Sequence, residues 1–231
     1  MACQSVTGCV PGGDQVSGHL VKTGSPMRLL PAILAMACVV LASNILVQFL
    51  CGDWLTWGAF TYPFAFLVTD LTNRIMGPAA ARRVVLWGFV TGLACSAVGT
   101  QIDGAFGPLV TMRVALGSAT AFLVAQLMDI AVFNRLRAGS WWRAPLVSTL
   151  VSSTLDTVIF FTLAFSAALA FIEPANDVSW ANEVLPLLGH GPMAPLWASL
   201  AVADWGVKLL LAIVALLPFR LAVARMVARS A

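Results

Sequence analysis

Hydrophobic residues along this chain gather into six long stretches separated by short polar connections. The stretches lie at residues 28–50, 54–75, 84–102, 109–133, 144–172 and 194–219. A helix rises 1.5 Å per residue, so about 20 apolar residues cross a hydrocarbon core about 30 Å thick. The pattern predicts an all-α, polytopic membrane protein, a bundle of six transmembrane helices in a lipid bilayer.

Composition supports this fold class and divides the chain into two terminal tails and one apolar domain. Sixty per cent of the residues are hydrophobic, 10% are charged, and the mean hydropathy is +0.91, outside the range of soluble domains. Residues 1–26 are rich in Gly, Ser and Thr and predict a disordered cytoplasmic tail. Residues 27–222 form the predicted six-helix transmembrane domain, and 223–231 form a short basic cytoplasmic tail.

The charges of the connections predict the orientation, because Lys and Arg in short loops stay on the cytoplasmic side. The basic residues of alternate connections and of the two ends are Lys22, Arg28, Arg74, Arg82, Arg83, Arg135, Arg137, Arg143, Arg220, Arg225 and Arg229. The acidic residues of the other connections are Asp53, Asp103, Glu173, Asp177 and Glu183. Both termini are therefore predicted to be cytoplasmic.

Several function classes find no support in the sequence. The chain has no HExxH, GxSxG or GxGD motif, and its two histidines, His19 and His190, fall outside the spans. The five cysteines show no CxxC pair. We therefore expect no enzyme activity, no catalytic residues, no metal and no cofactor. The net charge of +3 reflects the loop asymmetry, so nucleic acid is not an expected partner.

Ionisable residues inside the spans are the informative positions, since they are costly in hydrocarbon unless they face a packed interior, a partner or water. Asp70, Asn73 and Arg74 lie together near the cytoplasmic end of the second span, with Asp70 and Arg74 on one helical face. One interpretation is a salt bridge at the helix end, with Arg74 reaching the headgroups. The other is a functional group of residues.

A second embedded pair, Asp204 and Lys208, lies near the middle of the last span. It is either functional or a structural pair that closes the bundle. Asp156 is also close to mid-depth and has no basic residue within one turn. Its partner must come from another helix, from a substrate or from a bound proton.

Further polar candidates lie in the first and fourth spans. Arg113 is near the outer end of the fourth span, and Gln126 and Asp129 share a face near its inner end. Asn44 and Gln48 are four residues apart in the first span, where such amides also serve simply to join helices. Because several spans contribute polar groups and none carries a charge ladder, the pattern favours a site for a small polar ligand over an ion channel.

Aromatic and small residues complete the pattern. Rings accompany the polar positions and can stack on a flat heterocycle; they are Phe60, Tyr62, Phe64, Phe66 and Trp205. Tryptophans at span ends favour an interfacial belt. The third span aligns Gly88, Gly92, Ser96 and Gly99, which predicts close packing against a neighbouring span or, in a homodimer, against a second subunit.

Four segments carry a resemblance to a known family. They are "SNILVQF" with "LTWGAFTYPFAFLVTDLTNRI", "MRVALGSATAFLVAQLMDIAVFNRLR", "WWRAPLVSTLVSSTLDTVIFF" and "VADWGVKLLLAIVALLPF". In this order, over about residues 40–220, the chain resembles the queuosine precursor transporter family, also described as vitamin uptake transporters. The resemblance implies a bacterial inner-membrane importer of 7-deazaguanine precursors of the tRNA base queuosine, chiefly the 7-cyano and 7-aminomethyl forms. The tail of 26 residues and the acidic connection 173–193 are not part of the family pattern.

A deazaguanine offers N–H donors that a carboxylate accepts and a carbonyl that needs a donor. We hypothesise that Asp156 or Asp204 accepts from the N–H donors, and that Lys208 or Arg113 donates to the carbonyl or balances charge. The amides that would complete the hydrogen bonds are those of Asn44, Gln48 and Gln126. The ring that would stack on the ligand is that of Phe66, Tyr62 or Trp205. Asp70, Asn73 and Arg74 would form an inner gate or the inner rim of the site.

Three classes of function stay open at this point. The favoured one is a secondary carrier or facilitator, driven either by metabolic trapping of the base or by a proton carried on an acid such as Asp156. The second is a substrate-binding subunit of an energy-coupling-factor type transporter, which needs an ATPase module. The third is a structural membrane protein whose embedded charges only join helices.

Overall fold

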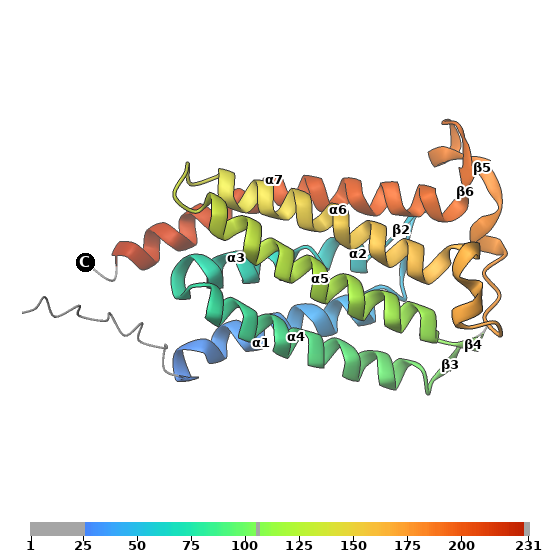
Figure 1. The fold of residues 1–231 in the computed structure, drawn as a ribbon, viewed down its shortest axis with the longest axis horizontal. Helices are drawn as coiled ribbons and strands as arrows, with labels where there is room; N and C mark the ends of the chain where they lie inside the picture. Colours follow the sequence, from blue (N-terminus) through green and yellow to red (C-terminus); the bar gives the residue numbers. More distant parts are fainter. Residues whose placement is uncertain (1–25, 105–106, 229–231) are drawn as a thin grey trace, which may run out of the picture.

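The computed structural model describes residues 26–104 and 107–228 (Figure 1). Almost all of the predicted tail 1–26 lies outside the described residues, as does the end of the predicted basic tail, 229–231. Five helices are long and apolar enough to cross a membrane: α1 (Pro26–Leu46), α4 (Pro78–Gly99), α5 (Met112–Leu136), α6 (Arg143–Phe165) and α7 (Leu196–Ala228). The prediction of a polytopic membrane protein is confirmed in this form.

The predicted continuous span 54–75 is wrong in detail. The chain there forms the short helix α2 (Gly58–Thr61), a turn at Tyr62 and Pro63, and α3 (Phe64–Met76). Pro63 has no N–H to donate and its ring disfavours a continuous helix at this point. With 13 residues, α3 is only about 20 Å long, which is shorter than a bilayer core.

Other boundaries also differ from the expected ones. The first helix ends at Leu46, and α6 ends at Phe165, where Ser166 is extended and a 3₁₀ segment, η1 (Ala167–Ile172), follows. At the opposite end of the bundle, α7 continues as a helix through most of the expected basic tail. Gly77 adopts φ +87° between α3 and α4, and Pro78 opens α4, so this tight turn uses the one residue type free to take that conformation.

The helices lie side by side with their connections at two ends (Figure 1). One end holds the start of α1, the end of α7 and the α3–α4 and α5–α6 turns; we call it the basic end, because Arg74, Arg82, Arg135 and Arg143 lie there. The other, the acidic end, holds the connections with Asp103, Glu173 and Asp177. The two described chain ends therefore lie at the same end of the bundle.

Three small antiparallel hairpins belong to the connections towards the acidic end. They are β1 (Leu50–Cys51) with β2 (Leu55–Thr56), β3 (Asp103–Gly104) with β4 (Gly107–Pro108), and β5 (Val184–Pro186) with β6 (Met193–Pro195). In the last hairpin Val184 is opposite Pro195 and Pro186 is opposite Met193. Two short 3₁₀ turns, η2 (Trp180–Asn182) and η3 (Leu187–Gly189), flank β5.

Packing places α3 inside the bundle, since it contacts α1, α4, α5, α6 and α7. The apolar core joins α1, α4 and α5 around Met36, Val84, Val85, Phe122 and Ile130. Large apolar side chains on the outer faces stay exposed, as on α7 at Leu210, Ile213 and Leu217. An exposed apolar surface of this kind suits lipid, while the polar residues of α3 are enclosed by protein.

The small residues of α4 pack within the chain. A Cβ added to Gly88 would lie 2.6 Å from Met36 and 2.9 Å from Phe122, and one added to Gly92 would lie 3.6 Å from Val40. The prediction that this face packs against a neighbouring span is therefore confirmed, and the neighbours are α1 and α5.

Candidate functional site

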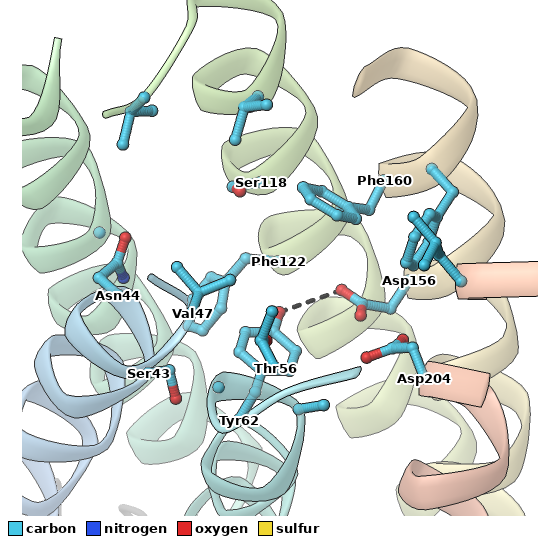
Figure 2. Close-up of a pocket in the computed structure, with 18 of the residues that line it drawn as sticks. Ser43, Asn44, Val47, Thr56, Tyr62, Ser118, Phe122, Asp156, Phe160 and Asp204 are labelled. Carbon is cyan, nitrogen blue, oxygen red and sulfur yellow. Dashed lines mark hydrogen bonds between the residues drawn. The ribbon is translucent and has the colours of Figure 1, made fainter. Parts of the chain in front are cut away.

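A cavity of about 500 Å³ lies between the helices in the half of the bundle nearer the acidic end (Figure 2). This main cavity has a size typical of small-molecule sites. Residues of the first hairpin, among them Leu50, Asp53 and Trp54, line it beside residues of α1, α4, α5, α6 and α7. Its wall is mostly apolar, with a compact group of charged residues on one side.

That charged group joins α6 to α7 through Lys208. The Lys208 Nζ donates to Asp156 Oδ2 at 2.7 Å, to Asp204 Oδ2 at 2.5 Å and to Thr157 Oγ1 at 3.0 Å. Asp156 and Lys208 are buried, at 3% and 4% exposure, so the ammonium has no bulk water around it. Desolvated charges are tolerated when each is paired and hydrogen-bonded, as these are.

The group resolves two open questions from the sequence. Asp156 finds its partner on another helix, since Lys208 lies 52 positions later in the chain. The predicted pair Asp204–Lys208 is confirmed as a salt bridge, and all three residues line the main cavity. The pair therefore joins two helices and also borders a space large enough for a ligand.

Tyr62 enters the same group from the break between α2 and α3. Its hydroxyl donates to Asp156 Oδ1 at 3.0 Å, drawn as a dashed line in Figure 2. The Lys208 Nζ lies 5.4 Å from the centre of its ring, within the range of a cation–π contact. The turn at Pro63 thus directs an aromatic ring and a hydroxyl into the cavity, a use of broken helices that recurs in transporters.

Asp204 has the freest carboxylate of the group. Its Oδ2 accepts from Lys208 and from Thr157 at 3.0 Å, while its Oδ1 accepts no hydrogen bond from any described residue. Its side chain is 16% exposed, against 4% for Asp156. With one cation and two carboxylates, the group has a formal charge of −1, so the cavity attracts N–H donors and disfavours anions.

The amide candidates of α1 lie on the opposite side of the cavity. Asn44 and Gln48 both line it, as predicted, and Asn44 Nδ2 donates to the Val40 carbonyl at 2.8 Å. Aromatic lining comes from Tyr62 and from two rings that the sequence did not single out, Phe122 and Phe160 (Figure 2). Flat apolar walls and peripheral acceptors together suit a planar, nitrogen-rich ring.

Arg113 and Trp205 are two of the ligand candidates that do not line the main cavity. Arg113 is fully buried but does not line the main cavity; its guanidinium donates to the carbonyls of Leu163 at 3.0 Å and Ser166 at 2.7 Å. It thereby caps the C-terminus of α6, where a cation is favourable. Trp205 points out of the cavity, and its indole N–H donates to the Thr154 hydroxyl at 2.9 Å.

The N-terminus of α5 beside Arg113 is held by the acidic connection. Glu173 accepts from the backbone N–H groups of Met112 and Arg113 at 3.2 and 3.0 Å. A carboxylate at this position satisfies donors that have no partner within the helix and complements its dipole. The acidic connection 173–193 is therefore packed onto the bundle at this point.

A second polar group, which we call the Asp70–Asp129 cluster, lies nearer the basic end. Asp70 of α3 accepts from Ser148 and Thr149 of α6, each at 3.4 Å. Asp129 of α5 accepts from Ser152 at 3.1 Å, and the two carboxyl groups lie within hydrogen-bonding range of each other. Both side chains are buried, at 3% and 0% exposure.

Amides complete this cluster. Gln126 accepts from the Thr69 hydroxyl at 2.6 Å, and Asn73 Nδ2 donates to the Ile130 carbonyl at 3.4 Å. Three buried polar atoms of the cluster have no hydrogen-bond partner in the described residues: Asn73 Oδ1, Gln126 Nε2 and Asp129 Oδ2. Gln126 therefore belongs to this cluster and lines no part of the main cavity.

The predicted salt bridge between Asp70 and Arg74 is not formed. The Arg74 guanidinium donates instead to the Arg137 carbonyl at 3.0 Å, and Arg137 donates back to the carbonyls of Asn73 and Arg74 at 2.7 and 2.9 Å. Both arginines thus cap the ends of α3 and α5, where cations are favoured. The Asp70 side chain faces inward, and no cation of the described residues forms a salt bridge with it.

Phe66 lies between the two polar groups. It is 1% exposed, and its ring packs edge-on against Tyr62 with centroids 6.1 Å apart. It does not line the main cavity, so the structure places it under Tyr62 and not beside a ligand. Phe66 is four residues from Tyr62 and four from Asp70 along the chain, so it lies between the main cavity and the Asp70–Asp129 cluster.

Sequence reasoning missed the polar stripe of α6. Ser148, Ser152 and Asp156 repeat every four residues, as do Thr149, Ser153 and Thr157, and all six are buried. The stripe contacts Asp70 and Asp129 at one end and Lys208 at the other. The four-residue spacing of Ser, Thr and Asp in "STLVSSTLDT" was the available signal.

No group of three or more His, Cys, Asp or Glu residues in the described ranges is arranged to hold a metal ion. The chain matches the family model described as "Putative vitamin uptake transporter" over residues 56–223. The chain belongs to this transporter family. The match covers both polar groups and the break at Pro63.

Curated relatives share much of the chain. The protein named "Queuosine precursor transporter" of Escherichia coli (strain K12) is 36% identical over 194 residues, which cover 78% of this chain and 79% of that protein. A "Probable queuosine precursor transporter" of Haemophilus influenzae is 34% identical over 177 residues, covering 71% and 66%. A protein of the same name from Bacillus subtilis (strain 168) is 35% identical over 130 residues, covering 48% and 56%. No solved structure matches the chain.

Proposed function

We propose that this chain imports a 7-deazaguanine precursor of queuosine, the 7-cyano form and also the 7-aminomethyl form, across the bacterial inner membrane. The observation that carries the proposal is the main cavity, which presents Asp204, Asp156, Lys208 and Tyr62 beside aromatic walls. Curated relatives that cover most of this chain bear the name of a queuosine precursor transporter, which supports this class of substrate.

The chemistry of the cavity supports the substrate in three respects. The free Asp204 Oδ1 accepts from the ring N–H or the exocyclic amine of a guanine-like edge. The Asn44 and Gln48 amides supply donors for the carbonyl, since the three N–H donors of the Lys208 ammonium are engaged with Asp156, Asp204 and Thr157. The rings of Tyr62, Phe122 and Phe160 pack on the faces of the heterocycle.

The formal charge of −1 narrows the ligand class further. A vitamin with a free carboxylate would add a second negative charge next to Asp204 in a poorly hydrated site, which is unfavourable. A neutral 7-cyano base or a cationic 7-aminomethyl base meets no such repulsion. This argument favours a nucleobase over acidic vitamins within the family.

The proposed topology has six passes, with α2 and α3 together forming the second one. It places the basic end and both termini in the cytoplasm, in line with the positive-inside rule. The main cavity then faces the outer side of the membrane, and Phe66 and the Asp70–Asp129 cluster close its cytoplasmic side. The state described here is thus an outward-facing carrier.

A growth-independent rescue assay tests the proposal. A bacterial strain that neither makes deazaguanine precursors nor imports them receives the gene, and queuosine in its tRNA is measured after each base is supplied in turn. The wild-type chain restores queuosine with at least one of the bases. Asp204→Ala lowers the initial uptake rate about tenfold to a hundredfold, the effect of losing hydrogen bonds to a charged group.

The control is Asp103→Asn, an exposed acidic residue of the β3–β4 hairpin that does not line the cavity; it should restore queuosine as well as wild type. Absence of rescue with every base, or wild-type uptake by Asp204→Ala at matched membrane levels, would contradict the proposal. Uptake by the purified chain in liposomes, without any ATPase subunit, tests whether the carrier is self-sufficient.

A further inference from the structure

The Asp70–Asp129 cluster has a feature that transport of a neutral base does not explain. Two carboxyl groups, on α3 and α5, lie within hydrogen-bonding range of each other in the protein interior. Two carboxylates at this range repel each other, whereas a carboxyl and a carboxylate share a hydrogen bond through one proton. The geometry therefore has a place for one proton between them.

No described cation neutralises the pair. Arg74 and Arg137 are engaged with backbone carbonyls, and Lys208 is engaged with Asp156 and Asp204. Arg113 caps α6. The remaining described basic residues on the surrounding helices α4 to α7 are exposed, and none forms a salt bridge with the cluster; they are Arg82, Arg83, Arg135, Arg143, Arg220 and Arg225.

Two further observations indicate that the cluster binds something. Asn73 and Gln126 are fully buried, yet Asn73 Oδ1 and Gln126 Nε2 find no hydrogen-bond partner among the described residues, and neither does Asp129 Oδ2. Buried polar atoms normally find partners, so unsatisfied ones mark a place where a ligand or a rearrangement completes the bonding. In addition, a hollow of about 20 Å³ reaches Asp70 and Thr149 from the α7 side, enough for about one water molecule.

A hydroxyl stripe links this cluster to the main cavity. On α6, Ser148 and Ser152 contact the two acids of the cluster, and Asp156 and Thr157, one turn further along, contact Lys208. Ser and Thr hydroxyls both donate and accept hydrogen bonds. The buried polar side chains of α6 therefore extend from the cluster to the charged group of the main cavity.

We propose that Asp70 and Asp129 hold one exchangeable proton, which enters with the base from the acidic end and leaves at the basic end. The inference rests on the proposed function, because it makes the carrier a proton symporter. Protonation leaves the pair with one negative charge instead of two, which lowers the cost of moving α3 against α5 within an apolar surround. No bond of the imported base changes in this step.

The experiment uses the purified full chain in sodium-free liposomes with labelled base and an imposed pH gradient, acid outside. Coupling to one proton raises the steady-state accumulation of base by up to about tenfold for each pH unit. Asp70→Asn and Asp129→Asn should still exchange external for internal base, but their accumulation should not respond to the gradient. Asp129→Glu keeps a carboxyl group and should keep a response, and Asp103→Asn should behave as wild type.

The outcomes separate this inference from the proposed function. If the wild-type chain carries the base at the same rate and to the same level with and without the gradient, the proton inference fails and the transport function stands. Wild-type responses in both Asn variants, or a response to a sodium gradient alone, would also overturn it. Absence of transport of every base defeats the proposed function instead.

A second measurement needs no substrate. Infrared spectra of the purified chain should contain a carboxylic acid C=O band that is lost reversibly as the pH is raised, and this band should be missing from Asp70→Asn and from Asp129→Asn. Its presence in both variants at wild-type intensity would refute the shared proton. Thermal melting of each variant verifies that the spectra come from folded protein.

Discussion

Each of the two polar groups of this protein contains a pair of aspartates, but only one pair has a cation bound to it. At the main cavity, Asp156 and Asp204 lie against Lys208, and each carboxylate has a cation within 2.7 Å. In the Asp70–Asp129 cluster, both carboxyl groups are buried and, among the described residues, bind hydroxyls and not cations. A permanent cation fixes a charge in place, whereas a cation-free pair of acids is free to gain and lose a proton.

The largest expected effect comes from removing the cation. Lys208→Met leaves the buried Asp156 and the partly exposed Asp204 without a counter-charge, which should lower the free energy of unfolding by about 3–5 kcal/mol and abolish uptake. Thermal melting in detergent measures the stability change, and Arg83→Met, an exposed arginine at the basic end, is the matched control. A Lys208→Met protein as stable as wild type would show that Asp156 and Asp204 do not need their cation. The two polar groups would then not differ in their dependence on a counter-charge.

A comparison of two Asp→Asn variants gives the next largest difference. Asp156→Asn should cost about 1–3 kcal/mol, since it weakens bonds to Lys208 and Tyr62. Asp129→Asn should change stability by less than about 1 kcal/mol, because an amide still accepts from Ser152 and donates to the Asp70 carboxylate in place of the shared proton. Chemical unfolding of both variants in one detergent checks the order, and a larger loss in Asp129→Asn would reverse the interpretation.

Tyr62→Phe probes the main cavity with a smaller change. Losing the hydroxyl bond to Asp156 should cost about 0.5–1.5 kcal/mol and weaken binding of the base. Uptake into liposomes should fall by the same factor with and without a pH gradient, because the proton site is intact. A selective loss of the gradient response in this variant would show that the two groups are not separate.

The smallest expected effect is that of Ser152→Ala. Its hydroxyl donates to Asp129 and to the Ser148 carbonyl, so its loss should cost at most about 1 kcal/mol. Thr91→Ala on α4 removes a hydroxyl that donates only to the Trp87 carbonyl one turn earlier and is the control. A difference in melting between the two variants isolates the bond to the carboxylate.

The sequence by itself determined the membrane class, the approximate positions but not the ends of the five long helices, and the separation of basic and acidic connections. These follow from local composition, because length and hydropathy decide whether a segment spans a bilayer. It also determined Asp204–Lys208, since residues four apart on a helix lie on one face. The same spacing suggested a salt bridge between Asp70 and Arg74 that is not formed. The Asp70 side chain faces the interior, and the Arg74 guanidinium binds the Arg137 carbonyl at a helix end instead.

Only the tertiary structure decided which polar residues meet across helices. Asp156 pairs with Lys208 from 52 positions away, and Asp70 lies by Asp129. Arg113 caps the end of α6 and does not line the main cavity. The break at Pro63, which brings Tyr62 into the cavity, could likewise not be predicted from hydropathy, because hydropathy is averaged over a whole span. Contacts between helices depend on how each is rotated and packed, and no property of a single segment contains that information.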